Sequence, residues 1–194
     1  MRRPFVSRLA QIPVPRWVYQ FRTYFASAPL CFALFCSYHE FEVDLIIWPL
    51  GLVIVLTGLS LRIWAQQHLH YRLKVHKRLT ATGPYRFIRN PLYLGNCLIC
   101  VGATVLSELF WMVPLTLLWC LGLYSLVIRY EEAHLLFKYG KAYGRYLEQV
   151  PRWVPRAVSF RNLQVTNHYF IKAVWTEASN LIIMVPFVIK EMLP

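Results

Sequence analysis

The sequence predicts an all-α integral membrane protein: a bundle of four transmembrane helices, or five if a last apolar stretch also crosses the bilayer. Three observations lead to this fold class. Of the 194 residues, 57% are hydrophobic and 15% are charged, whereas about 25% are charged in soluble domains. The apolar residues gather in long runs, and the basic residues gather between alternate runs.

Four apolar runs are the expected spans. They cover residues 24–38, 45–63, 91–106 and 109–128, and a bilayer crossing needs about 20 residues. The first and third runs are short, so each is expected to extend into its flank, to tilt, or to lie partly covered by other helices. A fifth stretch, residues 181–193, is interrupted by Pro186. The sequence leaves open whether this stretch crosses the membrane, re-enters it or lies in the interface.

The charged residues predict the orientation of the bundle. Of the 21 Lys and Arg residues, five lie in residues 1–23, seven in 62–90 and eight in 129–172. The two remaining connections carry no basic residue and hold Glu40, Glu42, Asp44 and Glu108. By the positive-inside rule we expect a multi-pass protein whose N-terminus, middle loop and C-terminal segment are cytoplasmic. Anionic lipid headgroups then account for the net charge of +12, and no nucleic-acid partner is expected.

The chain is expected to form a single domain over residues 1–194, because no linker, repeat or low-complexity tract divides it. Its motif-bearing core covers about residues 62–155, and residues 156–194 are a basic and apolar extension. The five cysteines lie in or beside apolar runs, which argues against a disulfide framework.

The motifs that are missing narrow the chemistry. No Gly-x-Gly occurs, so the chain lacks the glycine-rich turns of dinucleotide-binding and P-loop proteins. It also lacks the serine nucleophile elbow and the His-Glu-x-x-His zinc helix. Glu131 and His134 have the Glu-x-x-His spacing of di-iron bundles, but such bundles need that spacing twice. We therefore expect no metal site.

The third and fourth runs predict a tight antiparallel hairpin, because only residues 107–108 separate them. The hairpin would bring Asn90, at its start, close to Glu131, at its end. After the fourth run, apolar and aromatic residues recur at spacings of four, four, three and four: Leu135, Tyr139, Tyr143, Tyr146 and Val150. This stripe predicts one face of a single helix that packs against the bundle.

Two motif blocks converge at the cytoplasmic edge of this hairpin. The first is Gly83-Pro-Tyr-Arg-Phe-Ile-Arg-Asn-Pro-Leu-Tyr-Leu-Gly95, and the second runs from Glu131-Glu132 through Gly140, Tyr143 and Tyr146 to Val150-Pro-Arg152. Together they resemble the membrane-embedded family of isoprenylcysteine carboxyl methyltransferases and phospholipid methyltransferases. The pattern of that family is Gly-x-Tyr, Arg-His-Pro-x-Tyr, then Glu-Glu and Phe/Tyr-Gly-x-x-Tyr. The resemblance covers residues 77–155.

The resemblance implies S-adenosylmethionine as the cofactor. Glu131, nine residues before Gly140, corresponds to the cofactor-binding glutamate of the family. The cofactor-binding residues that the resemblance implies are Lys77, Arg78, Leu79, Thr80, Tyr85, Asn90, Pro91, Leu92, Tyr93 and Glu131. Glu132 is interpreted as a helix-surface residue. An ion pair of Glu131 with Arg86 or Arg89 is the structural alternative to cofactor binding.

Two positions depart from the family pattern. Family members carry His where this chain has Asn90, and Asn cannot take up a proton. Prenylcysteine-type members have a substrate-facing Arg four residues before the cofactor glutamate, where this chain has Val127, and Arg129 lies two residues further on. We expect Glu131 and Arg129 to be the catalytic residues.

The sequence thus predicts an integral membrane methyltransferase acting on a hydrophobic, lipid-like or prenylated acceptor through a carboxylate, amine or thiol. Two alternatives stay open. One is a membrane NADPH-dependent reductase of the sterol or enone type, by analogy of fold. The other is a non-catalytic membrane scaffold, which the departures at Asn90 and Val127 would suit.

Overall fold

The computed structural model describes residues 16–35, 44–70, 79–156 and 165–182, together with Val185. Within these residues every regular element is a helix, as the sequence predicts. The elements are α2 (Arg16–Gln20), α3 (Arg22–Phe35), α4 (Asp44–His70), the 3-10 helix η2 (Gly83–Arg86), α5 (Pro91–Leu106), α6 (Met112–Tyr139), α7 (Lys141–Gln149) and α8 (Phe170–Ile182).

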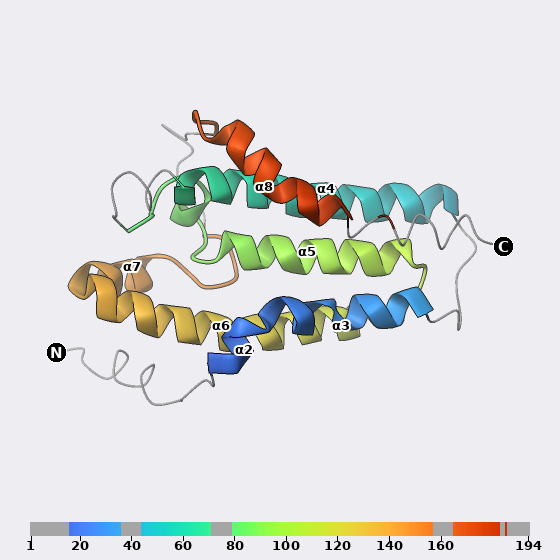
Figure 1. The fold of residues 1–194 in the computed structure, drawn as a ribbon, viewed down its shortest axis with the longest axis horizontal. Coiled ribbons are helices and arrows are strands. Elements are labelled where there is room, and N and C mark those ends of the chain that lie inside the picture. Colours follow the sequence, from blue (N-terminus) through green and yellow to red (C-terminus); the bar gives the residue numbers. More distant parts are fainter. Residues whose placement is uncertain (1–15, 36–43, 71–78, 157–164, 183–184, 186–194) are drawn as a thin grey trace.

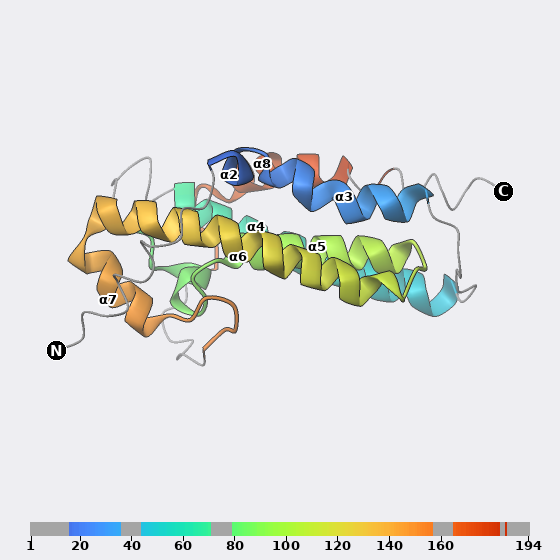
Figure 2. The same cartoon turned by 90° about the horizontal axis from the view of Figure 1, so that it is seen from below.

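The long helices lie side by side along the longest axis of the molecule. Figure 1 shows α5 between α4 and α6, with α8 crossing α4. Figure 2 shows α2 and α3 as a layer over α6, and α3 contacts both α5 and α6. α7 and η2 lie at the same end of the bundle (Figures 1 and 2), so both motif blocks are placed at that end.

Two helices of the described chain are long and apolar enough to cross a membrane, namely Leu45–Leu69 within α4 and Met112–Tyr139, which is α6. α3 has 14 residues and α5 has 16, fewer than the roughly 20 of a full crossing. Large apolar side chains on α3, α4 and α6 point outward, as lipid-facing side chains would. Of the stretch 181–193, only residues 181, 182 and 185 are described, so the prediction of a fifth span stays open.

α5 and α6 form the predicted antiparallel hairpin, but its connection is longer than predicted. α6 begins at Met112, so residues 107–111 make the turn. Glu108 has a φ of 62°, in the left-handed region that non-glycine residues seldom adopt. The full length of this turn could not be recognised in the sequence, because Leu109 is apolar and falls within the fourth run. The structure shows that Leu109 is fully buried in the turn.

The aromatic stripe is divided between two helices rather than lying on one. α6 ends at Tyr139 and α7 begins at Lys141, with Gly140 between them at a φ of 53°. Glycine adopts this conformation without a steric cost. The predicted packing role is confirmed by a buried cluster of Tyr143, Tyr146, Leu147 and Val150, against which Leu79, Leu135, Leu136 and Tyr139 pack.

Glycines bring α4 and α5 into close contact. A Cβ on Gly58 would lie 2.7 Å from the carbonyl oxygen of Gly95, and a Cβ on Gly102 would lie 2.9 Å from the carbonyl oxygen of Gly51. Small residues let helix backbones approach closely in membrane proteins. These contacts fix α4 against α5, whose first turn carries part of the motif.

We expect Gly102→Val to lower stability by about 1–3 kcal/mol, because the added side chain meets backbone atoms that cannot move aside. The matched control is Gly122→Val on α6, where a Cβ meets nothing within 4 Å. Thermal denaturation in detergent measures both variants against the native protein. Equal shifts of the two midpoints would contradict the close packing of α4 and α5.

Candidate functional site

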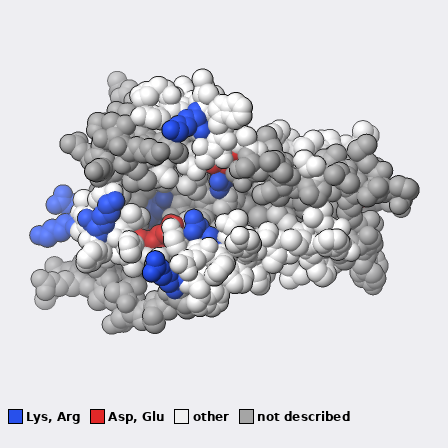
Figure 3. Space-filling view, in the orientation of Figure 1, with Lys and Arg blue, Asp and Glu red and all other residues white. Residues whose placement is uncertain are grey.

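A cavity of about 1070 Å³ lies at the end of the bundle that holds both motif blocks. Its wall is formed by side chains from α2, α3, α4, η2, α5, α6 and α7 and from the loop before α5. Figure 3 shows Lys and Arg side chains around acidic side chains at this hollow. The cavity therefore joins parts of the chain that are far apart in sequence.

Most of the predicted site residues line this cavity, and they come from both blocks: Leu79, Thr80, Tyr85, Asn90, Pro91, Leu92, Tyr93 and Glu131. Lys77 and Arg78 lie outside the described residues. Arg129 is half-buried and is not among the lining residues, so its catalytic role stays a prediction. Val127 is fully buried and does not line the cavity either.

The Gly-Pro-Tyr motif forms η2 and places Tyr85 in the cavity wall. Gly83 has a φ of 59°, and a Cβ there would lie 2.4 Å from the ring of His68, so glycine is required. The Tyr146 hydroxyl donates to the carbonyl oxygen of Tyr85 at 2.9 Å and ties η2 to α7. Burial raises the pKa of the Tyr85 and Tyr146 phenols, so both remain protonated hydrogen-bond donors.

Pro91 occupies the first position of α5, and Asn90 occupies its N-cap position. The Asn90 side chain makes no capping hydrogen bond. Its Nδ2 instead donates to the carbonyl oxygen of Arg152 at 3.4 Å. The first turn of α5 therefore has no side-chain cap, and the amino end of a helix favours an anionic group.

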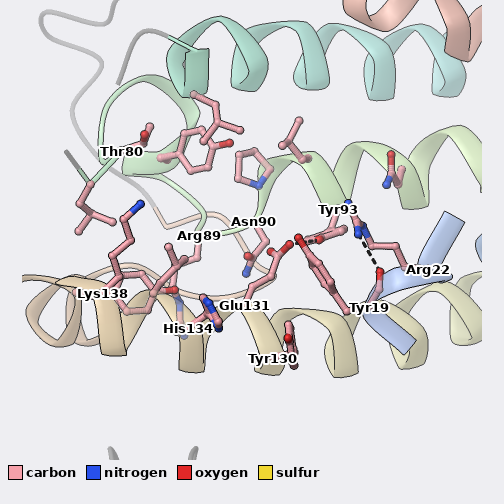
Figure 4. Close-up of a pocket in the computed structure, with 18 of the residues that line it drawn as sticks. Tyr19, Arg22, Thr80, Arg89, Asn90, Tyr93, Tyr130, Glu131, His134 and Lys138 are labelled. Atoms are coloured by element: carbon pink, nitrogen blue, oxygen red, sulfur yellow. Dashed lines mark hydrogen bonds between the residues drawn. The ribbon is translucent and has the colours of Figure 1, made fainter. Parts of the chain in front are cut away.

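Glu131 joins α6 to α5 inside the cavity. The Tyr93 hydroxyl donates to Glu131 Oε1 at 2.7 Å (Figure 4). A carboxylate accepts several hydrogen bonds, so Glu131 retains capacity for donors from a ligand. The alternative ion pair of Glu131 with Arg86 or Arg89 is wrong, because Arg89 pairs with Glu132 and Arg86 forms no ion pair among the described residues. Glu131 makes no ion pair within the described residues.

Glu132 is not the helix-surface residue that the sequence suggested. It is 1% exposed and forms ion pairs with two arginines. Arg89 Nη1 donates to its Oε1 at 2.8 Å, and Arg152 donates to both of its oxygens. Glu132 thereby connects α6 to the loop before α5 and to the segment after α7.

The segment after α7 explains why Glu132 is buried. Residues 151–156 run back along the loop before α5, where the Arg89 amide donates to the Pro151 carbonyl oxygen at 2.9 Å and the Arg156 amide donates to Phe87 at 3.0 Å. No helical periodicity predicts this return. Arg152 belongs to the second motif block, but its contact with Glu132 depends on tertiary structure.

Three polar atoms in the cavity wall are buried without a hydrogen-bond partner among the described residues. They are Thr80 Oγ1, Arg89 Nε and Tyr139 Oη. A buried polar group without a partner costs about 1–3 kcal/mol. The side chains that carry these atoms line the cavity, so part of its wall is polar.

Side chains of α2, of the start of α3 and of α6 make part of the cavity wall aromatic and basic, and sequence reasoning missed this part. The rings of Tyr19 and Tyr130 stack with centroids 5.0 Å apart, and His134 stacks on Tyr130 at 6.0 Å. Arg22 lies over the Tyr19 ring at 4.4 Å, and its Nη1 donates to the Tyr19 carbonyl oxygen at 2.8 Å. The sequence signal here is a basic residue beside an apolar run, which many membrane helices share.

Arg62 of α4 lines the cavity as well, and an acidic residue of α8 neutralises it. Its guanidinium pairs with Glu177 at 2.6 and 3.0 Å and also donates to Asn96. Glu177 is fully buried, so this ion pair holds α8 against α4. Within the parts of the chain that the structure describes, no group of three or more His, Cys, Asp or Glu side chains is placed to hold a metal ion.

Comparison with known proteins identifies relatives of the chain. Residues 46–142 match the family model described as phospholipid methyltransferase. The nickel-cobalt-cadmium resistance protein NccN of Alcaligenes xylosoxydans xylosoxydans is 30% identical over 113 residues, which are 58% of this chain and 50% of the relative. The cobalt-zinc-cadmium resistance protein CzcN of Cupriavidus metallidurans is 28% identical over 117 residues, which are 58% and 53% of the two chains. The chain thus spans about half the length of these relatives. No solved structure matches it significantly.

The family match covers half of the chain. It contains nearly all of α4, together with η2, α5 and α6, and therefore the cavity wall from Thr80 to Tyr139. α2, α3 and α8 lie outside it. The match confirms the resemblance seen in the motif blocks, and the chain belongs to the phospholipid methyltransferase family.

Proposed function

We propose that this protein is an integral membrane methyltransferase that uses S-adenosylmethionine. Family membership supports methyl transfer. α4 and α6 are long enough to span the bilayer, and in this proposal α3 and α5 complete a bundle of four spans as shorter, partly covered helices. The basic residues around the cavity support a cytoplasmic placement of the site.

The observation that carries the proposal is Glu131, a carboxylate of the cavity wall that accepts a hydrogen bond from Tyr93 and makes no ion pair among the described residues. Thr80, Asn90 and Tyr139 add polar side chains to the wall that Glu131 and Tyr93 line. A nucleoside-like ligand bears both hydrogen-bond donors and acceptors, so it would match the polar side chains of the wall and supply donors to the carboxylate.

The residues present fit S-adenosylmethionine. Glu131 would accept hydrogen bonds from its ribose hydroxyls or its amino group. Polar side chains of the wall, such as Thr80 and Tyr139, would donate to its acceptor atoms. The uncapped first turn of α5, at Pro91 and Leu92, would favour its carboxylate.

When bound, S-adenosylmethionine supplies a methyl group on a positively charged sulfur. The role of the protein is to align this methyl group with the acceptor and to keep water away. Asn90 cannot move a proton, so its role would be to position the cofactor through hydrogen bonds. The acceptor would be a lipid-like or prenylated molecule that presents a carboxylate, amine or thiol from the bilayer.

Transfer of a labelled methyl group tests this function. Proteoliposomes that contain the protein and a total lipid extract are incubated with S-adenosylmethionine labelled on the methyl group. We expect a labelled lipid, and we expect far less label with the Glu131→Gln variant. The proposal would be contradicted if folded wild-type protein transferred no label to any lipid class.

A further inference from the structure

Arg22 is a cavity-lining cation that has no carboxylate partner among the described residues. Among the other cations of the wall, Arg62 pairs with Glu177 and Arg89 pairs with Glu132. Arg16 and Lys138 form no ion pair among the described residues but are exposed, whereas Arg22 is half-buried. Arg22 uses one N–H on the Tyr19 carbonyl oxygen. Its remaining N–H groups are therefore available to a ligand.

The guanidinium of Arg22 is held in one place. The Tyr19 ring lies 4.4 Å below it, and the hydrogen bond to the Tyr19 backbone measures 2.8 Å. Tyr19 in turn stacks on Tyr130 of α6. A pre-positioned guanidinium loses little side-chain entropy when it binds a carboxylate or a phosphate, and it can bind either with two parallel hydrogen bonds.

Arg22 lies at the edge of the predicted cofactor residues, close enough to Tyr93 and Glu131 for its charge to act on both. Figure 4 shows Arg22 and Tyr19 at one end of the cavity and Thr80 at the other, with the Glu131 to Tyr93 hydrogen bond between them. A cofactor held at Thr80 and Glu131 would leave the Arg22 end for a second molecule.

The outer face beside this end is apolar. Trp17 and Phe21 are 53% and 50% exposed, and Tyr24 is 74% exposed. These residues belong to the α2 and α3 layer that covers α6 (Figure 2). In a bilayer such a face contacts hydrocarbon tails, so a lipid could place its tail along α2 and α3 with its polar end at Arg22.

We propose that Arg22 binds the anionic group, a carboxylate or a phosphate, of the lipid acceptor. This inference rests on the proposed methyltransferase function and names the chemistry of its acceptor. α2 and α3 precede the family match, so this determinant belongs to a part of the chain that the family model does not cover.

Three amphiphiles that carry the same tail and differ in their polar group test the proposal. Farnesoic acid, farnesyl phosphate and farnesol are titrated onto purified protein saturated with S-adenosylhomocysteine. We expect the wild-type protein to prefer an anion to farnesol, and Arg22→Gln to weaken binding of that anion about 10-fold or more. Whichever anion the wild-type protein prefers identifies the carboxylate or the phosphate as the recognised group.

Three comparisons make the result specific to Arg22. Arg22→Lys keeps the charge and should retain part of the anion preference. Arg145→Gln removes an exposed cation of α7 that does not line the cavity, and it should change nothing. Binding of farnesol should be the same in Arg22→Gln as in the wild type, and the affinity for S-adenosylhomocysteine should fall less than the affinity for the anion, because Arg22 acts on Glu131 only through its charge.

The proposal is overturned if the wild-type protein binds farnesol as tightly as both anions. It is also overturned if Arg22→Gln loses farnesol or S-adenosylhomocysteine affinity as strongly as anion affinity. A wild-type protein that binds no S-adenosylhomocysteine would contradict the proposed function instead. The same titrations without that compound would then still decide the anion preference.

Discussion

Replacing Glu132 with Gln is expected to lower the stability of the folded protein by about 3–5 kcal/mol, because removing one partner of a buried ion pair leaves charges uncompensated. Glu132 is 1% exposed, and the side chains of its partners Arg89 and Arg152 are 10% and 22% exposed. The Gln variant keeps the shape but leaves both guanidinium groups without a counter-ion.

Denaturation in detergent measures this effect. Glu148→Gln is the matched control, because Glu148 is exposed on α7 and surface substitutions usually change stability by less than about 0.5 kcal/mol. A Glu132→Gln variant as stable as the control would show that the two arginines do not depend on this carboxylate. The structural account of residues 151–156 would then be wrong.

Glu131→Gln is expected to weaken binding of S-adenosylhomocysteine by about 10- to 150-fold, which corresponds to roughly 1.5–3 kcal/mol for hydrogen bonds to a charged group. The amide oxygen of Gln can still accept the Tyr93 hydrogen bond. The fold should therefore persist, and the loss should appear in ligand affinity and not in stability.

The two variants are thus expected to differ: Glu131→Gln loses ligand affinity, and Glu132→Gln loses stability. Adjacent helical residues point about 100° apart, and here one faces the cavity while the other faces two arginines. Calorimetry on the folded fraction of each variant separates affinity from stability. If Glu132→Gln lost more affinity than Glu131→Gln while remaining folded, the roles assigned to the two residues would be reversed.

Much of the site follows from local sequence patterns. A hairpin of two apolar runs brings its two ends together wherever its turn lies, so Asn90 and Glu131 line the same cavity even though the connection proved to be residues 107–111. The positions of Pro91 and Gly83 also follow from local rules, because one starts a helix and the other requires a positive φ.

The remainder depends on contacts that no local pattern encodes. Glu132 is buried because residues 151–156 return beside the loop before α5. Tyr19 and Arg22 reach the cavity because α2 and α3 lie over α6 (Figure 2). The break at Gly140 did have a signal, a glycine within the helical stripe, but the regular spacing of the aromatic residues favoured a single helix.

Titration of the purified wild-type protein with S-adenosylhomocysteine and, separately, with NADPH tests the central claim most directly. We predict saturable binding of S-adenosylhomocysteine at one site and no binding of NADPH in the same concentration range. Binding of NADPH without S-adenosylhomocysteine would contradict the account and favour a reductase. Binding of neither by a folded protein would contradict it in favour of a scaffold without a cofactor.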